Sequence, residues 1–576
     1  MKKWMKYIRP YLPYFIIGPL CMIVEVVGEV VMPRLLAVVI NGANDGTLTA
    51  GGSLGVMGLM ILCAVLMMLG GVGGCYFGAK ASVSFAADLR ADIYGKIQTF
   101  SFADIDDFST GSLVTRATND VTQLQNFINM ILRMALRAPG MLVAALVMAI
   151  VIKPSLSVVF AVSIPIMAVA ITTIIRVGFP RFTRLQEKVD GLNSNVQENV
   201  TNVRVVKSFV REDHEIGKFA KSNSDLKNAG LSAMRVMIFM SPVMTLFMNA
   251  TVLVVILLGG RIVLNGGMDV GDLSSFITYV TQILFSLMMV TFLLMSSSRA
   301  MASARRIREV LDRQPDISDE NAARRDLTVA NGDVEFRDVT FRYYKNSEEP
   351  VLDRINLKIP GGATVGIIGS TGCGKTTLVS LIPRLYDCDE GQVLVDGTDV
   401  RDYGLVNLRD GIGMVLQNNT LFSGSIAENL RWGDENASDE EMKTAASYAQ
   451  ADKFVSSFTN GYDTLLDQGG TNVSGGQKQR LCIARALLKK PKILILDDST
   501  SAVDTATEAQ IRKAFREELE GSTKIIISQR ISSVMDADMI VVMNDGKITG
   551  IGKNDELLAS NEEYREIYVS QTGKEV

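Results

Sequence analysis

Histidine and cysteine are scarce in this sequence of 576 residues, which limits the chemistry it can perform. The one histidine, His214, lies in a charged stretch, REDHEIGK, where we expect a solvated surface residue and not a ligand. No two cysteines have Cys-x-x-Cys spacing, so the sequence indicates neither a zinc site nor a disulfide framework. The simpler interpretation is a soluble part that faces a reducing cytosol. The cysteines are Cys21, Cys63, Cys75, Cys373, Cys388 and Cys482.

Charge is also scarce, but only in the first half of the chain. Charged residues are dense in the second half, so the net charge of -4 averages two unlike halves and predicts no nucleic-acid partner. Hydrophobic residues make up 48% of the chain, and the mean hydropathy is positive, which favours a part embedded in lipid. The N-terminus has basic residues before an apolar run but no small-residue cleavage site. We therefore expect a retained first span.

Six apolar runs are long enough to cross a bilayer, which takes about 20 residues for each. Because they follow one another along the first half of the chain, they predict an all-α membrane domain of six spans. The runs are residues 14–40, 54–79, 130–152, 156–175, 238–258 and 273–295.

The links between these runs alternate in length and charge. The three short links contain only Lys153 and Arg261 as basic residues, whereas residues 80–129 and 176–236 are long and rich in Lys and Arg. By the positive-inside tendency, both long links and both termini are predicted to be cytoplasmic. The long links show helical periodicity, so we expect the spans to continue as helices into the cytosol. The expected location is the lipid bilayer of the cytoplasmic membrane.

Two features of the apolar runs allow two interpretations each. Glu25, Glu29 and Arg34 lie inside the first run, where an ionisable group costs about 2.5–3.5 kcal/mol on insertion scales. They form either a substrate-facing wall or, as the simpler interpretation, an intramolecular pair or a span end whose charged side chains snorkel. The sixth run carries a stripe of Met and aromatic residues that suits varied apolar ligands but is also typical of helix packing. The stripe comprises Phe276, Tyr279, Phe285, Met288, Met289, Phe292 and Met295.

A phosphate-binding loop dominates the second half. After a charged connector, short β-rich runs alternate with helical ones, which is typical of an α/β domain. The motif G-x-x-x-x-G-K-T follows a strand and precedes a helix, so backbone N–H groups can surround phosphate oxygens. Lys375 adds a positive charge, Thr376 is expected to bind Mg²⁺, and Cys373 is expected to pack. The loop comprises Gly369, Ser370, Thr371, Gly372, Cys373, Gly374, Lys375, Thr376 and Thr377.

Two further motifs follow the loop. The hydrophobic strand KILILD ends at Asp497, which is expected to supply a second Mg²⁺ ligand. In VSGGQ, Ser474 and Gln477 have the spacing of a capping box, so this motif could simply begin a helix.

The order of these motifs resembles the nucleotide-binding domain of ABC transporters. The phosphate loop comes first, and Gln417 follows a later strand. The motif VSGGQ comes next, then the strand that ends in Asp497, and then SAVD. With six spans ahead of it, the whole chain resembles a half-transporter of the ABC exporter type. That resemblance implies a multidomain membrane protein, with an all-α transmembrane domain and an α/β P-loop NTPase domain. The expected parts are a membrane domain at 1–313, a linker at 314–332 and a nucleotide-binding domain at 333–576.

The resemblance also implies roles for single residues. ATP with Mg²⁺ is the expected ligand, with Tyr343 stacked on adenine and Gln417 sensing Mg²⁺ and contacting the membrane half. In this family two such domains sandwich two ATPs, so each site combines one chain's phosphate loop with the other chain's signature, and Asp504 crosses the dimer interface. The signature residues are Ser474, Gly475, Gly476 and Gln477. The segments FADIDDFSTGSLVTRATNDV and VVKSFVREDHEIGKF resemble the links that carry coupling helices.

The chain departs from the family pattern at two positions of one site. The family has a glutamate directly after the strand aspartate and a histidine after a later strand, whereas this chain has Asp498 and Gln529. Asp498 is shorter by one carbon–carbon bond, roughly 1.5 Å, and a misplacement of about 1 Å can cost on the order of 10²-fold in rate. Gln529 can donate a hydrogen bond but cannot carry a proton or a charge.

Because the signature is intact while the chain's own site is altered, the sequence predicts one half of a heterodimer. The chain's own site is expected to be slow or inactive, and the partner half-transporter is expected to carry Glu and His and an altered signature. The predicted activity is ATP-driven export of amphipathic compounds, drug-like molecules or lipids, by alternating access. The alternatives are a homodimeric exporter of lipid or peptide and an ATP-gated regulator or channel.

Overall fold

The computed structural model describes residues 2–47, 49–320, 322–344, 347–499 and 502–573. The chain forms two compact units. The membrane unit comprises Met1–Ile97 and Gly111–Arg313, and the nucleotide unit comprises Gln98–Thr110 and Gln314–Val576. The short segment Gln98–Thr110, which the sequence places in the membrane domain, thus groups with the nucleotide unit.

The membrane unit is entirely helical in the part of the chain that is described. Six helical segments are long and apolar enough to cross a membrane, as the sequence predicts. The longest helix has 53 residues, and its length of about 80 Å far exceeds the roughly 30 Å of a hydrocarbon core. The helices are α1 (Lys2–Ile8), α2 (Leu12–Asn44), α3 (Ala50–Gln98), α5 (Thr110–Thr115), α6 (Val121–Met134), α7 (Arg137–Ile152), α8 (Pro154–Thr201), α9 (Val203–Ser208), α10 (Glu212–Leu264) and α11 (Val270–Asp312).

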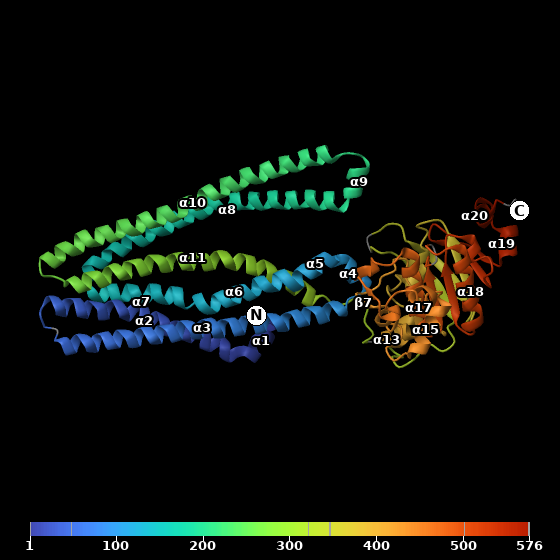
Figure 1. Ribbon diagram of the computed structural model, residues 1–576, viewed down its shortest axis with the longest axis horizontal. Coiled ribbons are helices and arrows are strands. Elements are labelled where there is room, and N and C mark those ends of the chain that lie inside the picture. Colours follow the sequence, from blue (N-terminus) through green and yellow to red (C-terminus); the bar gives the residue numbers. More distant parts are fainter. Residues whose placement is uncertain (1, 48, 321, 345–346, 500–501, 574–576) are drawn as a thin grey trace. The chain divides into compact units, whose positions relative to one another are not determined.

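Within this unit, α8 packs along α10, and α11 packs against α2, α6 and α7. Figure 1 shows α8 and α10 side by side over their whole length, diverging from α11 toward α9. The core that joins the helices is apolar, and Phe276 and Tyr279 of α11 are fully buried in it. These two members of the Met and aromatic stripe therefore serve packing, whereas Phe285 and Phe292 are exposed. The side chain of Met295 lies outside the described residues.

Helix α11 also supplies hydrogen bonds to the backbone of α2. Pro33 lies inside α2 and has no N–H, so the carbonyl of Glu29 lacks its donor within the helix. Gln282 Nε2 donates to that carbonyl at 3.0 Å. Tyr279 Oη donates to Val30 O at 2.6 Å, and Ser275 Oγ donates to Pro33 O at 2.5 Å. The bilayer core offers no water for the freed Glu29 carbonyl, so its partner must come from a neighbouring helix.

The three ionisable residues of the first apolar run all form ion pairs. Arg137 Nη2 lies 2.6 Å from Glu29 Oε1 and 3.1 Å from Glu25 Oε1, and Arg34 pairs with Asp272. These pairs are intramolecular, and Glu25 also lines a pocket.

The nucleotide unit is an α/β structure, which confirms the predicted fold class of six apolar helices followed by an α/β domain. Its main sheet has six strands in the order β12-β11-β3-β10-β9-β6, and all neighbouring pairs are parallel except β11 with β12. An antiparallel sheet has the order β2-β1-β4-β5. The strands are β1 (Val334–Phe341), β2 (Leu352–Ile359), β3 (Thr364–Gly369), β4 (Glu390–Val395), β5 (Thr398–Asp399), β6 (Ile412–Val415), β7 (Gly424–Ser425), β8 (Leu465–Leu466), β9 (Ile493–Asp497), β10 (Thr523–Ile527), β11 (Met539–Asn544) and β12 (Lys547–Gly552).

Helices cover the main sheet, and its central strands are buried on both faces. Ile493 and Ile495 of β9 belong to one apolar core, while Leu494 and Leu496 belong to the other, because successive side chains of a strand point to opposite faces. The helices are α4 (Phe102–Phe108), α12 (Lys375–Ser380), α13 (Leu405–Asp410), α14 (Ile426–Leu430), α15 (Asp439–Tyr448), α16 (Asp452–Val455), α17 (Gly475–Leu488), α18 (Thr505–Glu518), α19 (Asn554–Ser560) and α20 (Glu562–Thr572).

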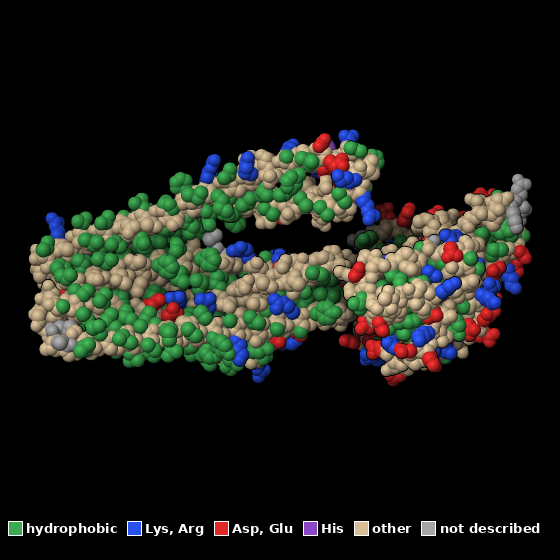
Figure 2. Space-filling model, in the orientation of Figure 1, with side chains coloured by type: hydrophobic (Ala, Val, Ile, Leu, Met, Phe, Trp, Pro, Cys, Tyr) green, Lys and Arg blue, Asp and Glu red, His purple; other side chains and the backbone are tan. Residues whose placement is uncertain are grey.

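The surfaces of the two units differ as the composition predicts. Figure 2 shows hydrophobic side chains over most of the visible face of the long helices, and acidic and basic side chains spread over the nucleotide unit. An apolar surface of this size is suited to lipid rather than water.

Candidate nucleotide-binding site

The phosphate loop joins the end of β3 to the start of α12, at the centre of the main sheet. Gly374 has φ +96° and caps α12, a conformation that L side chains rarely adopt. Lys375 Nζ donates to Gly369 O at 2.9 Å and to Ser370 O at 2.6 Å, so the ammonium lies across the loop. Cys373 is buried, in keeping with a packing role. The loop therefore presents backbone N–H groups, a cation and a helix N-terminus together.

Thr376 and Asp497, the two predicted Mg²⁺ ligands from the chain's loop and strand, lie side by side. Thr376 Oγ1 donates to Asp497 Oδ1 at 3.0 Å. The other carboxylate oxygen, Asp497 Oδ2, is buried and has no hydrogen-bond partner among the described residues. Burial raises the pKa of Asp497, although the bond from Thr376 opposes this. A hydroxyl and an unsatisfied carboxylate oxygen are suitable ligands for a hard cation such as Mg²⁺.

The two residues that depart from the family pattern also meet. They follow adjacent parallel strands, β9 and β10, so their side chains emerge at the same edge of the sheet. Gln529 Nε2 donates to Asp498 Oδ2 at 3.3 Å. Asp498 has φ +47°, and burial raises the pKa of its carboxyl group. The amide thus holds one oxygen of the shortened carboxylate.

Tyr343 and Gln417 lie at the margins of this site. Tyr343 Oη lies 2.9 Å from Thr377 Oγ1, and 43% of the tyrosine is exposed, which leaves part of the ring accessible to a base. Gln417 follows β6, the strand beside β9, but its side chain is exposed and forms no hydrogen bond with described residues. The structure therefore places Tyr343 beside the phosphate loop and does not bring the Gln417 amide to Thr376 or Asp497.

The signature forms the N-terminus of α17. Ser474 and Gln477 form the capping box that their spacing suggests: Ser474 N donates to Gln477 Oε1 at 2.9 Å and Gln477 N to Ser474 Oγ at 3.3 Å. A Cβ atom at Gly476 would lie 2.7 Å from Ala502 O, so this position requires glycine. Among described residues, no hydrogen bond or ion pair joins Ser474, Gly475, Gly476 or Gln477 to the phosphate loop.

Asp504 lies on the segment that packs against the signature. Its side chain accepts a hydrogen bond from Thr507 N at 3.0 Å and caps α18. That backbone hydrogen bond lowers the pKa of Asp504, so the carboxylate is charged and exposed. An exposed charge beside the signature is compatible with the predicted role at an interface.

Sequence reasoning missed the attachment of α4. Its Phe102 ring lies 6.1 Å from the ring of Tyr386, and Tyr386 Oη donates to Asp106 Oδ2 at 3.2 Å. The Tyr386 ring also meets Tyr343 edge-on at 5.3 Å, so one tyrosine contacts both α4 and the margin of the phosphate loop. The available signal was an aromatic residue shortly after the phosphate-loop helix.

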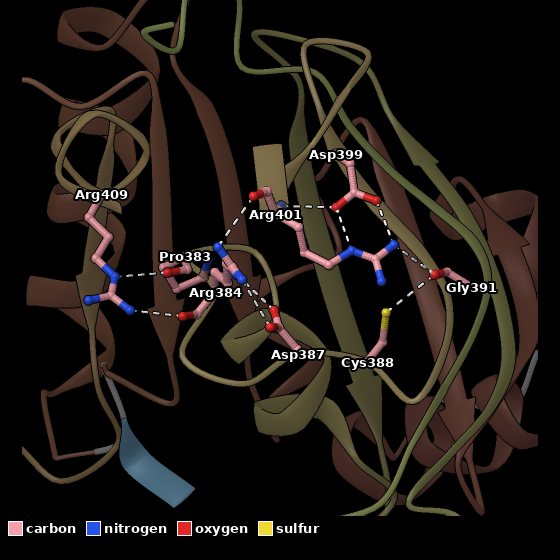
Figure 3. A network of polar contacts seen from close by, with 8 residues as sticks. All are labelled: Pro383, Arg384, Asp387, Cys388, Gly391, Asp399, Arg401 and Arg409. Atoms are coloured by element: carbon pink, nitrogen blue, oxygen red, sulfur yellow. Dashed lines mark hydrogen bonds and ion pairs between the residues drawn. The ribbon is translucent and has the colours of Figure 1, made fainter. Parts of the chain in front are cut away.

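Two arginines, of which Arg384 is buried, hold the backbone around Tyr386 (Figure 3). Arg384 has φ +51° and a side chain that is 7% exposed, and it donates to both oxygens of Asp387 at 2.8 and 3.1 Å. Arg409 donates to Pro383 O at 3.0 Å and to Arg384 O at 2.8 Å. The segment that carries Tyr386 is therefore fixed from two sides.

A third arginine, Arg401, lies between Arg384 and Arg409 in the sequence and extends this network. Arg401 donates to Asp399 Oδ1 at 3.0 Å, to Asp399 Oδ2 at 2.6 Å and to Gly391 O at 3.3 Å (Figure 3). Cys388 Sγ donates to the same Gly391 carbonyl at 3.5 Å. Burial raises the pKa of the Cys388 thiol, which keeps it protonated as a donor.

Removal of the central arginine is expected to destabilise the nucleotide unit. Arg384→Ala breaks a bidentate ion pair whose arginine is buried and should cost about 2 kcal/mol, roughly 4–8 °C in the melting temperature of a domain of this size. Thermal unfolding of the full chain in detergent measures this. Arg337→Ala is the matched control, because Arg337 forms a pair of similar length, 2.8 Å to Glu335, on the exposed surface. Equal decreases in melting temperature for both variants would contradict the proposal that burial makes the Arg384 pair the more stabilising one.

The raised pKa of Asp497 predicts a pH dependence of Mg²⁺ binding. Mg²⁺ binds the deprotonated carboxylate, so the gain in ATP affinity on adding Mg²⁺ should decline as the pH falls toward the raised pKa. The decline should begin above the ordinary aspartate value of 3.8. Nucleotide titrations of the full chain with and without Mg²⁺ measure this gain. Asp497→Asn should remove this pH dependence. An unchanged pH dependence in that variant would contradict the assignment of Asp497 as a Mg²⁺ ligand.

Comparison with known proteins places this geometry in a family. Residues 15–288 match the ABC transporter transmembrane region, and residues 352–501 match the ABC transporter family of ATP-binding domains. The chain is 39% identical over 577 aligned residues to an uncharacterized ABC transporter ATP-binding protein, YfiB, of Bacillus subtilis strain 168. That alignment covers 100% of this chain and 99% of the relative.

Two further similarities support this assignment. The chain is 34% identical to an ATP-dependent lipid A-core flippase of Desulfotalea psychrophila over 85% of each sequence. Its fold is similar to that of a bacterial Atm1-family ABC exporter with ATP bound, with a TM-score of 0.81, 24% identity and coverage of 98% of this chain and 99% of that one. The six apolar helices make it an integral membrane protein. The chain belongs to the ABC transporters, as a half-transporter in which one transmembrane domain is fused to one ATP-binding domain.

Proposed function

We propose that this chain is one subunit of an ATP-driven exporter that moves amphipathic compounds out across the cytoplasmic membrane. The family and the exporter fold of its structural neighbour support transport driven by ATP. The Lys and Arg residues of the long links and the N-terminus support a cytosolic position for both termini and for the nucleotide unit. Alternating access then follows from closure of two nucleotide domains, which coupling helices transmit to the long helices.

In this proposal the chain binds ATP with Mg²⁺ through its own loop. Lys375 and the loop N–H groups hold the phosphates, Thr376 and Asp497 hold Mg²⁺, and Tyr343 packs against adenine. Bound Mg²⁺ neutralises charge on the phosphate oxygens. Gln417 reaches the ion only after a change of its side-chain conformation. The adjacency of Thr376 and Asp497 and the unsatisfied Asp497 Oδ2 support these roles.

The single observation that carries the heterodimer proposal is the pair formed by Asp498 and Gln529. Where the family pattern has glutamate and histidine, this chain has a shorter acid with its oxygen bonded to a neutral amide at 3.3 Å. Neither residue can activate water with the family's geometry, because a general base must lie within hydrogen-bond reach of the water it deprotonates. The chain's own site is therefore slow or inactive.

The intact signature then serves a competent site on a different half-transporter. Ser474, Gly475 and Gly476 keep the family's residues and a well-formed helix N-terminus, and no hydrogen bond or ion pair between described residues ties them to the chain's own loop. Beyond the apolar spans, the turn after α9 exposes Phe209 by 72% and Val210 by 80%. Apolar residues exposed to this degree in the cytosolic link favour a covering partner subunit.

The decisive experiment compares the chain alone with the pair that it forms in its native membrane. Purified alone, it should hydrolyse ATP slowly, and co-purification with its partner half-transporter should restore hydrolysis and uptake of dyes or lipids into inside-out vesicles. In the pair, Asp498→Asn should change the rate by no more than about twofold, because the competent site lies on the partner's loop. Fast hydrolysis by the isolated chain that Asp498→Asn abolishes would refute the proposal.

A homodimeric lipid exporter is the second candidate, since a relative is named a lipid A-core flippase. It predicts that the isolated chain itself moves fluorescent lipid between leaflets when ATP is added. The same preparation of isolated chain therefore separates the two candidates.

A further inference from the structure

A polar pocket lies among α2, α3, α6 and α7 in the apolar part of the membrane unit. Its volume is about 470 Å³, within the range of small-molecule sites. Figure 2 shows a small group of acidic and basic side chains surrounded by hydrophobic ones on the long helices. The side chains that line the pocket include Met22, Glu25, Cys75, Met130, Arg133 and Arg137. Charged groups within a membrane segment are costly and are therefore functional candidates by default.

The carboxylates near this pocket are only partly satisfied. Within the described part of the chain, Arg137 alone pairs with both Glu25 and Glu29, and its closer contact is with Glu29 at 2.6 Å. Glu25 Oε2 is buried and has no hydrogen-bond partner among the described residues. A buried carboxylate oxygen without a donor is destabilising unless a ligand supplies one. The pocket therefore offers an acceptor for a cationic donor.

A separate cation lines the same pocket. Arg133 lies on α6, one turn before Arg137, and its guanidinium group forms no ion pair or hydrogen bond with described residues. The charges of the two carboxylates and the two guanidinium groups sum to zero. One oxygen of Glu25 and the guanidinium group of Arg133 nevertheless have no partner among the described residues. The complementary ligand carries one ammonium and one anionic group and no net charge.

The remaining walls accept an apolar body. Met22, Met130 and Met134 line the pocket, and methionine side chains adapt to irregular apolar shapes. A Cβ atom at Gly71 of α3 would lie 3.5 Å from the carboxyl carbon of Glu25, so the absence of a side chain there keeps space beside the carboxylate. The pocket thus combines two opposite charges with a flexible apolar wall.

We propose that this pocket binds a zwitterionic amphiphile. The ammonium of the ligand donates to Glu25 Oε2, its phosphate or carboxylate group accepts hydrogen bonds from Arg133, and its hydrocarbon part lies against the methionines. This inference names the substrate class of the exporter and rests on the proposed function. The ligand's headgroup can belong to a membrane lipid or to a soluble amphiphile, since both present the same chemistry.

Binding is tested without ATP by protection of Cys75, an exposed thiol in the pocket wall. The full chain in detergent is treated with a methanethiosulfonate reagent, and labelling of Cys75 is quantified by mass spectrometry. The probes are amphiphiles with one tail length and a phosphoethanolamine, phosphate or amine headgroup. The phosphoethanolamine probe should protect Cys75 at a concentration about tenfold lower than the phosphate probe or the amine probe requires. Each of those two probes lacks one of the two charge contacts, with Glu25 or with Arg133. Equal protection by all three probes would overturn the proposal.

Matched variants separate recognition from structure. Glu25→Gln should abolish the preference for the phosphoethanolamine probe over the phosphate probe. Arg133→Gln should abolish the preference for the phosphoethanolamine probe over the amine probe. Glu29→Gln is the control, since Glu29 pairs with the same Arg137 but does not line the pocket. It should retain both preferences. If Glu25→Gln and Glu29→Gln behave alike, the open oxygen has no role in recognition and the proposal fails.

Two further arms locate the ligand and separate this inference from the proposed function. In nanodiscs, protection of Cys75 by phosphatidylethanolamine but not by phosphatidylglycerol assigns a lipid source, and protection by the added amphiphile alone assigns a soluble source. In vesicles containing the complete pair, ATP should drive movement of the zwitterionic probe. If binding depends on Glu25 and Arg133 but ATP drives no transport of the probe, the export proposal is refuted and the binding proposal stands. If Glu25→Gln and Arg133→Gln both leave transport of the probe unchanged, the binding proposal is refuted and the export proposal stands.

Discussion

The double substitution Asp498→Glu with Gln529→His should increase ATP hydrolysis by the isolated chain by about 10²-fold. The longer acid extends the carboxylate by one bond toward the attacking water, and the imidazole replaces an amide that now bonds to Asp498 at 3.3 Å. The signature in the same chain is intact, so two copies of the variant should form two competent sites. Steady-state phosphate release by the purified full chain measures the gain.

Three controls accompany this result. Asp498→Glu alone should give a smaller gain, since the two positions act at one site. Adding Asp497→Asn should abolish the gain, because the Mg²⁺ ligand is lost. A wild-type chain that already hydrolyses ATP as fast as the double variant would show that the aspartate is an adequate base.

Two inactive versions of this double variant should restore hydrolysis when they are co-expressed. Lys375→Ala removes the cation of the phosphate loop, and Gly476→Val places a side chain where a Cβ atom would lie 2.7 Å from Ala502 O. Each alone should reduce hydrolysis by about 10²-fold or more. In a mixed dimer, the intact loop of one chain faces the intact signature of the other, so one complete site forms. Purification through two different affinity tags isolates the mixed dimer for assay.

Retained nucleotide binding by the Gly476→Val chain controls for misfolding, because its own phosphate loop is unaltered. Recovery in the mixed dimer requires that each site draw residues from both chains. Inactivity of a mixed dimer whose Gly476→Val subunit still binds nucleotide would indicate that loop and signature act within one chain.

The neighbours in the nucleotide site could be predicted where strand order determines them. The phosphate loop, Asp497 and Gln529 each lie at or just after the end of a strand. The strands β3, β10 and β9 are adjacent and parallel, so their ends meet at one edge. A motif together with its flanking strand therefore specifies position. The orientation of the Gln417 side chain could not be predicted this way. Gln417 lies beyond the end of β6, where strand order does not determine the side-chain rotamer.

Long-range partners were the part that the sequence could not reveal. Arg137 lies 108 residues after Glu29, and nothing in the local pattern selects it over Arg133 of the same apolar run. Tyr386 was missed for the same reason, because its partners on α4 are about 280 positions away. Such contacts depend on how helices are placed in space, whereas hydrophobic periodicity reports only the inward face of each element.

The hydrogen bonds from α11 to α2 determine which parts of the membrane unit can move. Three carbonyls of α2 around Pro33 accept hydrogen bonds from side chains of α11, so we expect these two helices to move together. The α8–α10 pair is the separate arm, connected through the turns at Lys153 and Gly267, and Lys153 Nζ donates to Gly267 O at 2.7 Å. Because this hydrogen bond joins the two turns at one end of the pair, we expect that end to move least when the transporter changes conformation. We expect the largest displacement at the opposite end, which carries α9.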